Sequence, residues 1–160
     1  MEGGYLEDIP VHKLSMEKIA DGLGFYGPLV IMGCVIVVLM HRPKYMVAYV
    51  LFVFLNNVIN RGLKMMIQEE RPANPKPFSK YERYQNAEHY GMPSGHASSV
   101  AFSFVYLFVL YPYSWWLLPV GFIAGLTCIQ RWKYRRHSVE QIAVGAMGGG
   151  TLAYIVHKII

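Results

Sequence analysis

Three polar clusters interrupt an otherwise apolar chain, and each contains side chains that can bind or transfer an anionic group. In the first cluster, Lys64 and Arg71 are seven residues apart, which is two helical turns. If the helix continues that far, both cations project from one edge, and Pro72 then turns the chain away. The alternative interpretation is two cations at a membrane boundary, with their aliphatic stems in the lipid.

The second cluster has the sequence GMPSGHASS, from Gly91 to Ser99, and precedes an apolar run. Ser94 is suited to cap a helix, whose free N–H groups and dipole attract anions. Gly95 lets a ligand approach the backbone because it has no side chain, and His96 is presented at the rim. The alternative is an ordinary capped helix start that happens to contain a histidine.

The third cluster has the sequence QRWKYRRHSVEQ. Arg131 closes one apolar run and His137 opens the next, so the turn between them brings a guanidinium and an imidazole to the same rim. Ser138 and Gln141 have the spacing of a capping box. Gln141, one turn beyond His137, could equally accept the ring N–H of that histidine and fix its tautomer. Spacing alone leaves both roles of Gln141 open.

Together the clusters predict one site. If the helices are antiparallel, their ends deliver to one face the cations of Lys64, Arg71 and Arg131, both imidazoles and a helix N-terminus. Three cations and several N–H donors would then surround a tetrahedral dianion. Cations that serve only as membrane anchors would have no reason to converge.

Long uncharged blocks must position these clusters, and they predict an all-α membrane protein. Hydrophobic residues make up 54% of the 160 residues, which is typical of membrane proteins when they gather in blocks. The blocks cover residues 23–40, 45–60, 97–114, 115–129 and 142–156. Most are shorter than the roughly 20 residues of a straight crossing, so each helix should extend into its polar flanks. We predict a single membrane-embedded domain, residues 1–160, built as a helical bundle with about five transmembrane helices.

Two segments lie outside these blocks. Residues 1–22 are acidic and lack a basic start, which argues against a cleaved signal, and their loose apolar periodicity predicts a possible helix on the bilayer surface. Residues 72–92 form a loop between the first two clusters. With Lys76, Lys80 and Arg83, this loop is interpreted either as a lid over a lipid head group or as a solvated connector.

The two shortest joints, residues 41–44 and 111–114, define one face of the membrane. The N-terminus, residues 61–92 and residues 131–137 then emerge on the other face. All Lys and Arg residues belong to this second face except Arg42, Lys44 and Lys158. The positive-inside rule makes that face cytoplasmic, although an anion site would recruit the same cations on either side.

Small and polar residues inside the blocks predict helix contacts. Gly121 and Gly125 in the fourth block, and Gly145 and Gly149 in the fifth, are spaced four apart, so these two blocks are expected to touch. The second block contains Asn56, Asn57 and Asn60. They are interpreted either as interhelical hydrogen-bond partners or as a polar floor for the site.

In this order the clusters resemble the three-part signature of the type 2 phosphatidic acid phosphatase superfamily. The signature is a Lys, six residues and Arg-Pro, then Pro-Ser-Gly-His, then an Arg, five residues and a His; here it spans Lys64 to Gln141. The superfamily consists of integral-membrane lipid phosphatases related to vanadium haloperoxidases. Its usual members have six spans, so this chain would lack the first.

The resemblance implies a role for each matching residue. His137 would attack phosphorus and form a phosphohistidine, while His96 would protonate the leaving oxygen and then activate water. The phosphoryl oxygens would be bound by Lys64, Arg71, Ser94, Gly95 and Arg131. The resemblance implies no metal and no other cofactor.

Two positions depart from the family pattern. Gln130 stands where a Ser usually precedes Arg131. Gln141 stands where the family has an Asp; its amide oxygen can accept the N–H of His137 but brings no charge, so the developing imidazolium is less stabilised. The neighbouring Glu140 points about a hundred degrees away along the helix. The third cluster is similar to that of the dolichyl diphosphate phosphatase branch, which has His, three residues and Gln.

This branch similarity makes polyprenyl diphosphate the favoured substrate, because a phosphoanhydride has a better leaving group and tolerates a weaker nucleophile. Phosphatidate and phosphatidylglycerol phosphate are the alternatives. One rival function is a catalytically silent protein that binds anionic lipids, which the missing Asp favours. Another is a metal hydrolase that uses His96, His137 and Glu140, but these residues lack the usual ligand spacings.

The expected partners are a lipid phosphate substrate and the bilayer. Nucleic acid is not expected despite a sequence pI near 9.2, because the cations cluster where phosphate chemistry would occur. The sequence makes no prediction of oligomeric state. We expect a multi-pass membrane protein, located in the endoplasmic reticulum in a eukaryotic cell and in the plasma membrane otherwise.

Overall fold

The computed structural model describes residues 16–79, 82 and 89–160. Over these residues the chain forms helices α1 (Met16–Leu39), α2 (Pro43–Ile67), α4 (Gly95–Leu110), α5 (Leu117–Lys133) and α6 (Val139–Ile159). The described part contains no β-strand, apart from one isolated antiparallel bridge between Glu70 and Tyr90. The prediction of an all-α helical bundle is confirmed.

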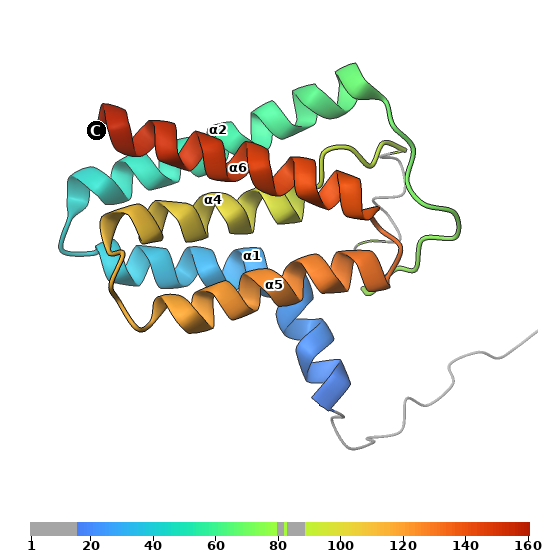
Figure 1. Ribbon diagram of the computed structural model, residues 1–160, viewed down its shortest axis with the longest axis horizontal. Helices are drawn as coiled ribbons and strands as arrows, with labels where there is room; N and C mark the ends of the chain where they lie inside the picture. The colour runs from blue at the N-terminus through green and yellow to red at the C-terminus, as the bar shows by residue number, and fades with distance from the viewer. Residues whose placement is uncertain (1–15, 80–81, 83–88) are drawn as a thin grey trace, which may run out of the picture.

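Helix α4 lies at the centre of the bundle (Figure 1). It contacts each of the other four helices, and its most extensive contact is with α6. Helices α1 and α5 pair closely with each other on another side of α4. Helix α2 has thinner contacts with its neighbours. The end of α2, the start of α4, the end of α5 and the start of α6 therefore meet at one end of the bundle.

Helix α1 changes direction, so that its first turns leave the bundle at an angle (Figure 1). Pro28 lies inside this helix, and an internal proline removes a backbone hydrogen bond and bends the helix. The first turns are tied to the end of α5, because Lys133 Nζ pairs with Glu17 Oε1 and Asp21 Oδ2, each at 2.7 Å.

The possible surface helix at residues 1–22 stays a prediction. Residues 1–15 lie outside the described residues. The part from Met16 onward is the beginning of α1, and its Glu17 and Asp21 pair with Lys133 of α5.

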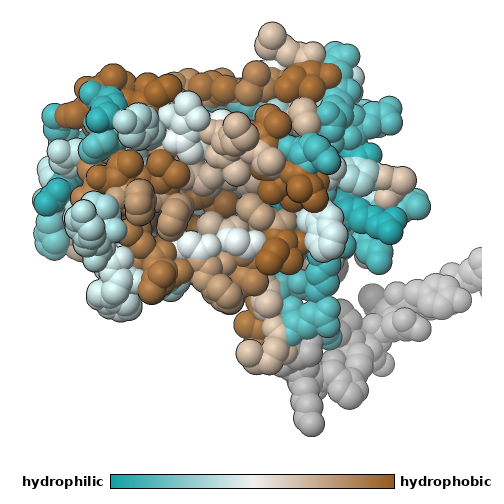
Figure 2. All heavy atoms as spheres, viewed as in Figure 1, coloured by the Kyte–Doolittle hydropathy of each residue, from teal (hydrophilic) through white to brown (hydrophobic). Residues whose placement is uncertain are grey.

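Three helices, α1, α2 and α6, are long and apolar enough to cross a membrane. Helix α4 is apolar but has 16 residues, and α5 has 17. Figure 2 shows apolar side chains over the middle of the visible face and hydrophilic residues gathered at the ends, above all at the end that carries the three clusters. The five expected blocks thus correspond to five helices, three of which meet the criteria for spanning a bilayer.

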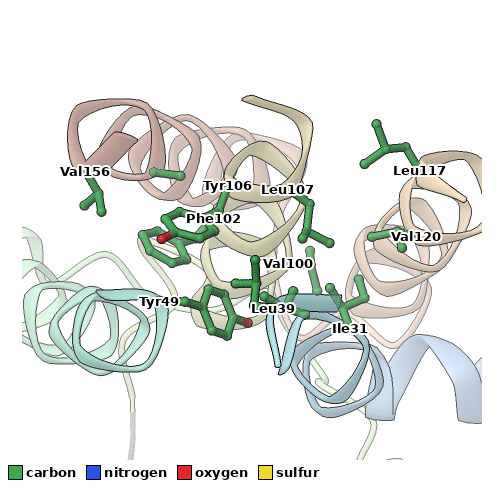
Figure 3. Packing of buried hydrophobic residues seen from close by; sticks show 12 residues of the cluster. Ile31, Leu39, Tyr49, Val100, Phe102, Tyr106, Leu107, Leu117, Val120 and Val156 are labelled. Atoms are coloured by element: carbon green, nitrogen blue, oxygen red, sulfur yellow. The ribbon is translucent and has the colours of Figure 1, made fainter. Parts of the chain in front are cut away.

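The apolar core is shown in Figure 3. Its residues come from the second half of α1, the first half of α2, α4, the start of α5 and the end of α6, and therefore lie mainly in the half of the bundle opposite the three clusters. Tyr49 of α2 packs against Phe102 and Tyr106 of α4, with ring centroids 5.9 and 5.5 Å away. The Tyr49 hydroxyl is 2.8 Å from Ser103 Oγ, so this buried polar group is satisfied. Because side chains from several helices pack closely in this half, they fix the relative positions of the helices that continue into the other half.

Helix α6 packs against α4 through glycines. A Cβ on Gly145 would overlap the backbone of Ser94, and a Cβ on Gly149 would overlap the backbone of Ser98. The two backbones therefore approach as closely as small residues allow. This contact fixes the start of α6 against the start of α4.

The fourth and fifth blocks, helices α5 and α6, touch as expected, but their glycines do not make the contact. Among the helix pairs in contact, α5 and α6 have the thinnest contact. On α5, a Cβ at Gly125 would meet nothing within 4 Å, and one at Gly121 would lie 3.1 Å from the Phe104 ring of α4. Small residues four apart create a flat surface on a helix, but this spacing does not specify which neighbour uses it.

The asparagines of α2 face α4. Ser98 Oγ donates to Asn56 Oδ1 at 2.9 Å, and Ser99 Oγ donates to Asn57 Oδ1 at 3.3 Å. Interhelical hydrogen bonding is therefore confirmed for Asn56 and Asn57. Asn60 is buried and lies beside the start of α4, where the polar half of the interior begins.

Candidate active site

All three clusters lie at the same end of the bundle (Figure 1). Several polar and charged side chains are buried there, which is costly unless they have partners or a ligand. They are Asn60, Lys64, Glu82, Ser94, Gln130, Arg131, Arg136, His137 and Gln141.

The first cluster reaches the site from two different elements. Lys64 is in the last turn of α2, and its Nζ donates to the carbonyl of Tyr90 at 3.0 Å. The helix ends at Ile67, because Gln68 adopts a left-handed conformation with φ of 53°. Arg71 lies beyond the helix, and its Nη1 donates to the carbonyl of Arg136 at 3.0 Å. The prediction that a continuing helix aligns Lys64 with Arg71 is therefore wrong, although both cations reach this end.

The second cluster begins α4, as predicted. Ser94 is the N-cap residue, and its hydroxyl accepts from the backbone N–H of Ala97. Its own N–H donates to the carbonyl of Gln141 at 2.9 Å, which joins α4 to α6. A Cβ at Gly95 would make only an ordinary contact, 3.6 Å from Asn60 Oδ1, so the protein leaves the space beside this backbone open.

The next residue, His96, faces an aromatic wall. Its ring centroid is 6.1 Å from that of Phe25 in α1. The guanidinium carbon of Arg131 lies 5.1 Å from the same Phe25 ring. Phe25 therefore stands between the second and third clusters, and helix α1 contributes to the site.

Arg131 is held on two of its three nitrogens. Its Nε donates to Gln130 Oε1 at 2.6 Å, and its Nη1 donates to Glu82 Oε1 at 2.6 Å. The third nitrogen, Nη2, is buried and has no hydrogen-bond partner in the part of the chain that the structure describes. Gln130 and Glu82 therefore orient the guanidinium and leave one edge of it for an anion.

His137 and Gln141 show that the two possible roles of Gln141 are compatible. The capping box is present, since Gln141 N–H donates to Ser138 Oγ and Ser138 N–H donates to Gln141 Oε1. The same Oε1 lies 3.3 Å from His137 Nδ1. One oxygen with two lone pairs can serve both partners.

The nitrogen of the Gln141 side chain binds the end of the first cluster. Its Nε2 donates to Glu69 Oε1 and to the carbonyl of Glu70, each at 2.8 Å. A Cβ at Gly91 would overlap this amide, so only glycine leaves room for it. Gln141 thus links all three clusters.

The pKa of the His137 imidazole is lowered well below its ordinary value of 6.5. Burial is the main cause, followed by the charges of Arg71 and Lys64 and then by His96 and Arg131. These residues come from all three clusters, so the clusters share one electrostatic environment. The ring is therefore neutral at pH 7, which is the form that has a free lone pair.

Sequence reasoning missed three charged residues at this site. They are Glu69, Glu82 and Arg136; Arg136 is buried, and its Nε lies 3.5 Å from Glu82 Oε1. Glu69 and Arg136 could have been noticed, because each is next to or close to a cluster residue in the sequence. Nothing in the sequence distinguishes Glu82 from other charged residues of the 72–92 loop.

The 72–92 loop was expected to be a lid or a connector. The structure describes residues 72–79, 82 and 89–92, and Lys80 and Arg83 lie outside the described residues. The backbone N–H of Lys76 donates to the carbonyl of Tyr134 at 2.9 Å, and Glu82 binds Arg131. The described parts of the loop are therefore anchored to the end of α5.

An open groove of about 600 Å³ borders this site. It lies between α1, α2 and α4. Its apolar wall includes Leu29, Met32, Val50, Val53 and Phe54, and its polar end includes Asn60, Lys64, Gly95 and His96. A molecule with an apolar chain and an anionic head matches this change in lining.

In the part of the chain that the structure describes, metal-binding side chains do not gather at this end. Within residues 16–79, 82 and 89–160, no group of three His, Cys, Asp or Glu side chains is placed to hold a metal ion. His96, His137 and Glu140, the set considered for a metal hydrolase, therefore do not form such a group.

The chain matches the family model described as the PAP2 superfamily over residues 45–160. No curated protein and no solved structure matches it. The matched region begins in α2 and includes all three clusters, and the match indicates a membrane phosphatase that acts on phosphate esters. The match identifies the superfamily and does not distinguish its branches, so the similarity to the dolichyl diphosphate branch stays a prediction. The order of the three clusters and this match lead to the same conclusion: the chain belongs to the PAP2 superfamily.

Proposed function

We propose that the chain is a multi-pass membrane phosphatase that hydrolyses a lipid phosphate or diphosphate through a phosphohistidine intermediate. Polyprenyl diphosphate is the favoured substrate. The observation that carries this proposal is the groove, because its apolar wall leads directly to Lys64, Gly95 and His96. Residues 1–160 would act as one domain, with all five helices in the bilayer and α4 and α5 extended by their polar flanks.

In the first step, His137 Nε2 attacks the phosphorus atom of the bound substrate. His96 gives a proton to the leaving oxygen, so the lipid alcohol or lipid monophosphate departs as the P–O bond breaks. The negative charge of the phosphoryl group favours the protonated form of His96 when substrate is bound. Gln141 Oε1 accepts the Nδ1 proton of His137 throughout this step.

In the second step, His96 takes a proton from water, and the resulting hydroxide attacks the phosphohistidine. The P–N bond breaks, inorganic phosphate forms, and both imidazoles return to their starting states. The cations of Lys64, Arg71 and Arg131 stabilise the equatorial oxygens in both steps, together with Ser94 and the backbone at Gly95. Arg131 Nη2 supports this role because it is buried without another described partner.

The replacement of the family's Asp by Gln141 favours a diphosphate. A neutral amide beside His137 stabilises the imidazolium less directly than a carboxylate does. A diphosphate releases a phosphate as its leaving group, and this is a better leaving group than the alkoxide released from phosphatidate or phosphatidylglycerol phosphate.

The same replacement supports a second candidate function, a catalytically silent protein that binds anionic lipids. In that case the cations and the groove would hold a lipid phosphate without hydrolysing it. The two candidates differ in one measurable respect, which is the release of inorganic phosphate.

The purified chain in detergent tests the proposal. We expect phosphate release from polyprenyl diphosphate to be faster than from phosphatidate or phosphatidylglycerol phosphate, to be inhibited by vanadate and to persist with a strong chelator. His137→Ala should lower the rate by about 1,000-fold or more, because it removes the nucleophile. Radiolabelled substrate should leave an acid-labile phosphoprotein in the wild type and none in His137→Ala.

His41→Ala is the matched control, because His41 is exposed in the turn at the opposite end of the bundle. Its activity should equal that of the wild type. Binding to anionic vesicles without any phosphate release would favour the silent protein. Loss of activity with the chelator would favour a metal hydrolase, and faster cleavage of phosphatidate would overturn the substrate preference.

A further inference from the structure

The side-chain amide of Gln141 has all of its hydrogen-bonding groups in use. Its Nε2 donates to Glu69 Oε1 and to the Glu70 carbonyl, each at 2.8 Å. Its Oε1 accepts from the Ser138 N–H at 3.2 Å and lies 3.3 Å from His137 Nδ1. An amide has two donors and two acceptor lone pairs, so no capacity remains.

These partners permit one orientation of the amide. If it were turned around, its oxygen would face the Glu69 carboxylate and the Glu70 carbonyl, and its NH₂ would face the N–H of Ser138. Each of those pairs would bring like groups together. Oε1 must therefore face His137, and Nδ1 of His137 must carry the proton. The lone pair then lies on Nε2 of His137, the nitrogen that attacks phosphorus in the proposed reaction.

We propose that Glu69 is a positioning residue for His137, which holds the Gln141 amide and supplies through it the negative charge that the family usually takes from an Asp. This inference rests on the proposed function. The carboxylate is displaced by one amide group relative to the usual arrangement, because Gln141 stands between Glu69 and His137.

The backbone around Glu69 is fixed, although the side chain lies at the rim. The Glu69 carbonyl accepts from the Gly91 N–H at 2.7 Å, and Glu70 forms the isolated bridge with Tyr90. Gly91 also packs against the Gln141 amide. The carboxylate is therefore presented from an anchored segment, and an ordinary surface glutamate would lack this support.

The charges around His137 explain why such a carboxylate is useful. The ring faces Lys64 from α2, Arg71 from the segment after α2, His96 from α4 and Arg131 from α5. These groups disfavour the positive charge that develops on the imidazole in the reaction. A negative charge behind Gln141 acts in the opposite direction.

The same geometry explains why position 141 is not acidic. A carboxylate there would face the Glu69 carboxylate and the Glu70 carbonyl, which are both acceptors. Glu69 and Gln141 thus depend on each other. Swapping the carboxylate and the amide between the two positions should be tolerated better than changing Gln141 alone. This property separates a charge-supplying role from simple packing.

Four variants test the inference with polyprenyl diphosphate as substrate. Glu69→Gln should lower kcat by about 10- to 100-fold, the range seen for carboxylates behind metal-bound histidines, with little change in KM. Gln141→Glu should lose more. The double variant Glu69→Gln/Gln141→Glu should recover at least about tenfold over Gln141→Glu alone, because the pair is coupled. Glu17→Gln, which removes an exposed carboxylate in the first turn of α1, should behave as the wild type.

The pKa of His137 provides a second readout, which can be measured even if the protein has no catalytic activity. The pKa of the His137 ring can be measured by ¹⁵N NMR. Loss of the negative charge in Glu69→Gln should lower this pKa, and Glu17→Gln should leave it unchanged. The acidic limb of the kcat/KM profile should shift to lower pH in the same variant, which a purely structural role would not cause.

An unchanged kcat in Glu69→Gln, or a double variant no better than Gln141→Glu, would overturn the inference while the proposed function stands. If the wild type releases no phosphate, the proposed function fails, and the NMR titration still decides whether Glu69 acts on His137. An unchanged pKa in Glu69→Gln would then overturn the inference separately.

Discussion

Helix α4 faces two very different neighbours. Toward α6, backbone meets backbone, because Gly145 and Gly149 leave no room for a side chain. Toward α2, the contact is made by hydroxyl–amide pairs such as Ser98 with Asn56, and open grooves of about 470 and 600 Å³ lie on either side of α2. The molecule is thus closely packed on one side of its central helix and open on the other.

This difference assigns different tasks to the two sides. The packed side carries His137 and Gln141, which must keep their relative position for the hydrogen bond between them to form. The open side carries Lys64 and borders the groove beside His96. In the proposed function, a lipid would therefore approach beside α2 without disturbing the residues that hold the His137 imidazole.

Breaking the packed side should have the largest effect. Gly149→Ala places a methyl group onto the backbone of Ser98, and the forced separation of α4 and α6 should cost about 3 kcal/mol of stability. We expect a lower unfolding midpoint in detergent. Phosphate release should also fall by at least about 100-fold, because a shift of about 1 Å between catalytic groups can have an effect of this size.

Gly148→Ala is the control for this prediction. A Cβ at Gly148 would meet nothing within 4 Å, and alanine is the better helix former. This variant should be at least as stable as the wild type. Equal destabilisation of both variants would contradict the close approach of α4 and α6.

Replacing the Arg131 guanidinium by another cationic group should have the next largest effect. Arg131→Lys retains the positive charge but cannot bind Gln130 and Glu82 and still offer a further donor edge. We expect kcat/KM to fall by about 100-fold. The unfolding midpoint should also fall, because Gln130 or Glu82 loses a buried hydrogen bond. Arg135→Lys, at an exposed position in the same turn, should retain full activity; an equal loss there would show a general charge effect.

Filling the open side should have a smaller and substrate-dependent effect. Val53 lines the groove, and Val53→Trp should lower kcat/KM for polyprenyl diphosphate by about tenfold, the effect of roughly 1.4 kcal/mol. Hydrolysis of a short, water-soluble diphosphate should not change. Val58→Trp, on an exposed face of the same helix, is the control. Equal losses on both substrates would argue against an apolar chain in this groove.

The smallest effect concerns pH. Because the pKa of His137 is lowered well below 6.5 in the folded state, the unfolded imidazole takes up a proton below pH 6.5 while the folded one does not. Stability should thus be highest above pH 6.5 and fall below it by up to about 1.4 kcal/mol per pH unit, until the folded pKa is reached. His137→Gln should remove this part of the decline between pH 7.5 and 5.5 in thermal unfolding. An unchanged decline would contradict the burial of a neutral ring.

Much of the fold could be predicted because it depends on local signals. Apolar runs gave the five helices, and Ser94 and Ser138 begin α4 and α6 as N-caps. The common location of the clusters followed from antiparallel connections. The end of α2 could not be predicted, because the left-handed conformation of Gln68 has no clear marker in the sequence.

The supporting contacts of the site depend on residues far apart in the chain. Glu69 and Gln141 are separated by 72 positions, and Glu82 and Arg131 by 49. Glycine spacing marked the flat face of α6 but not its partner. Interactions of this kind depend on how the helices pack, so a single sequence contains the residues but not their pairing.

The position of the Phe25 ring affects where the boundaries of a recombinant fragment should be placed. The family match begins at residue 45, yet Phe25, in α1, lies between Arg131 and His96. A recombinant fragment starting at Tyr45 would retain every signature residue and lose one wall around them. A fragment designed from the family match alone would therefore lack part of the site, so we expect an active fragment to include α1.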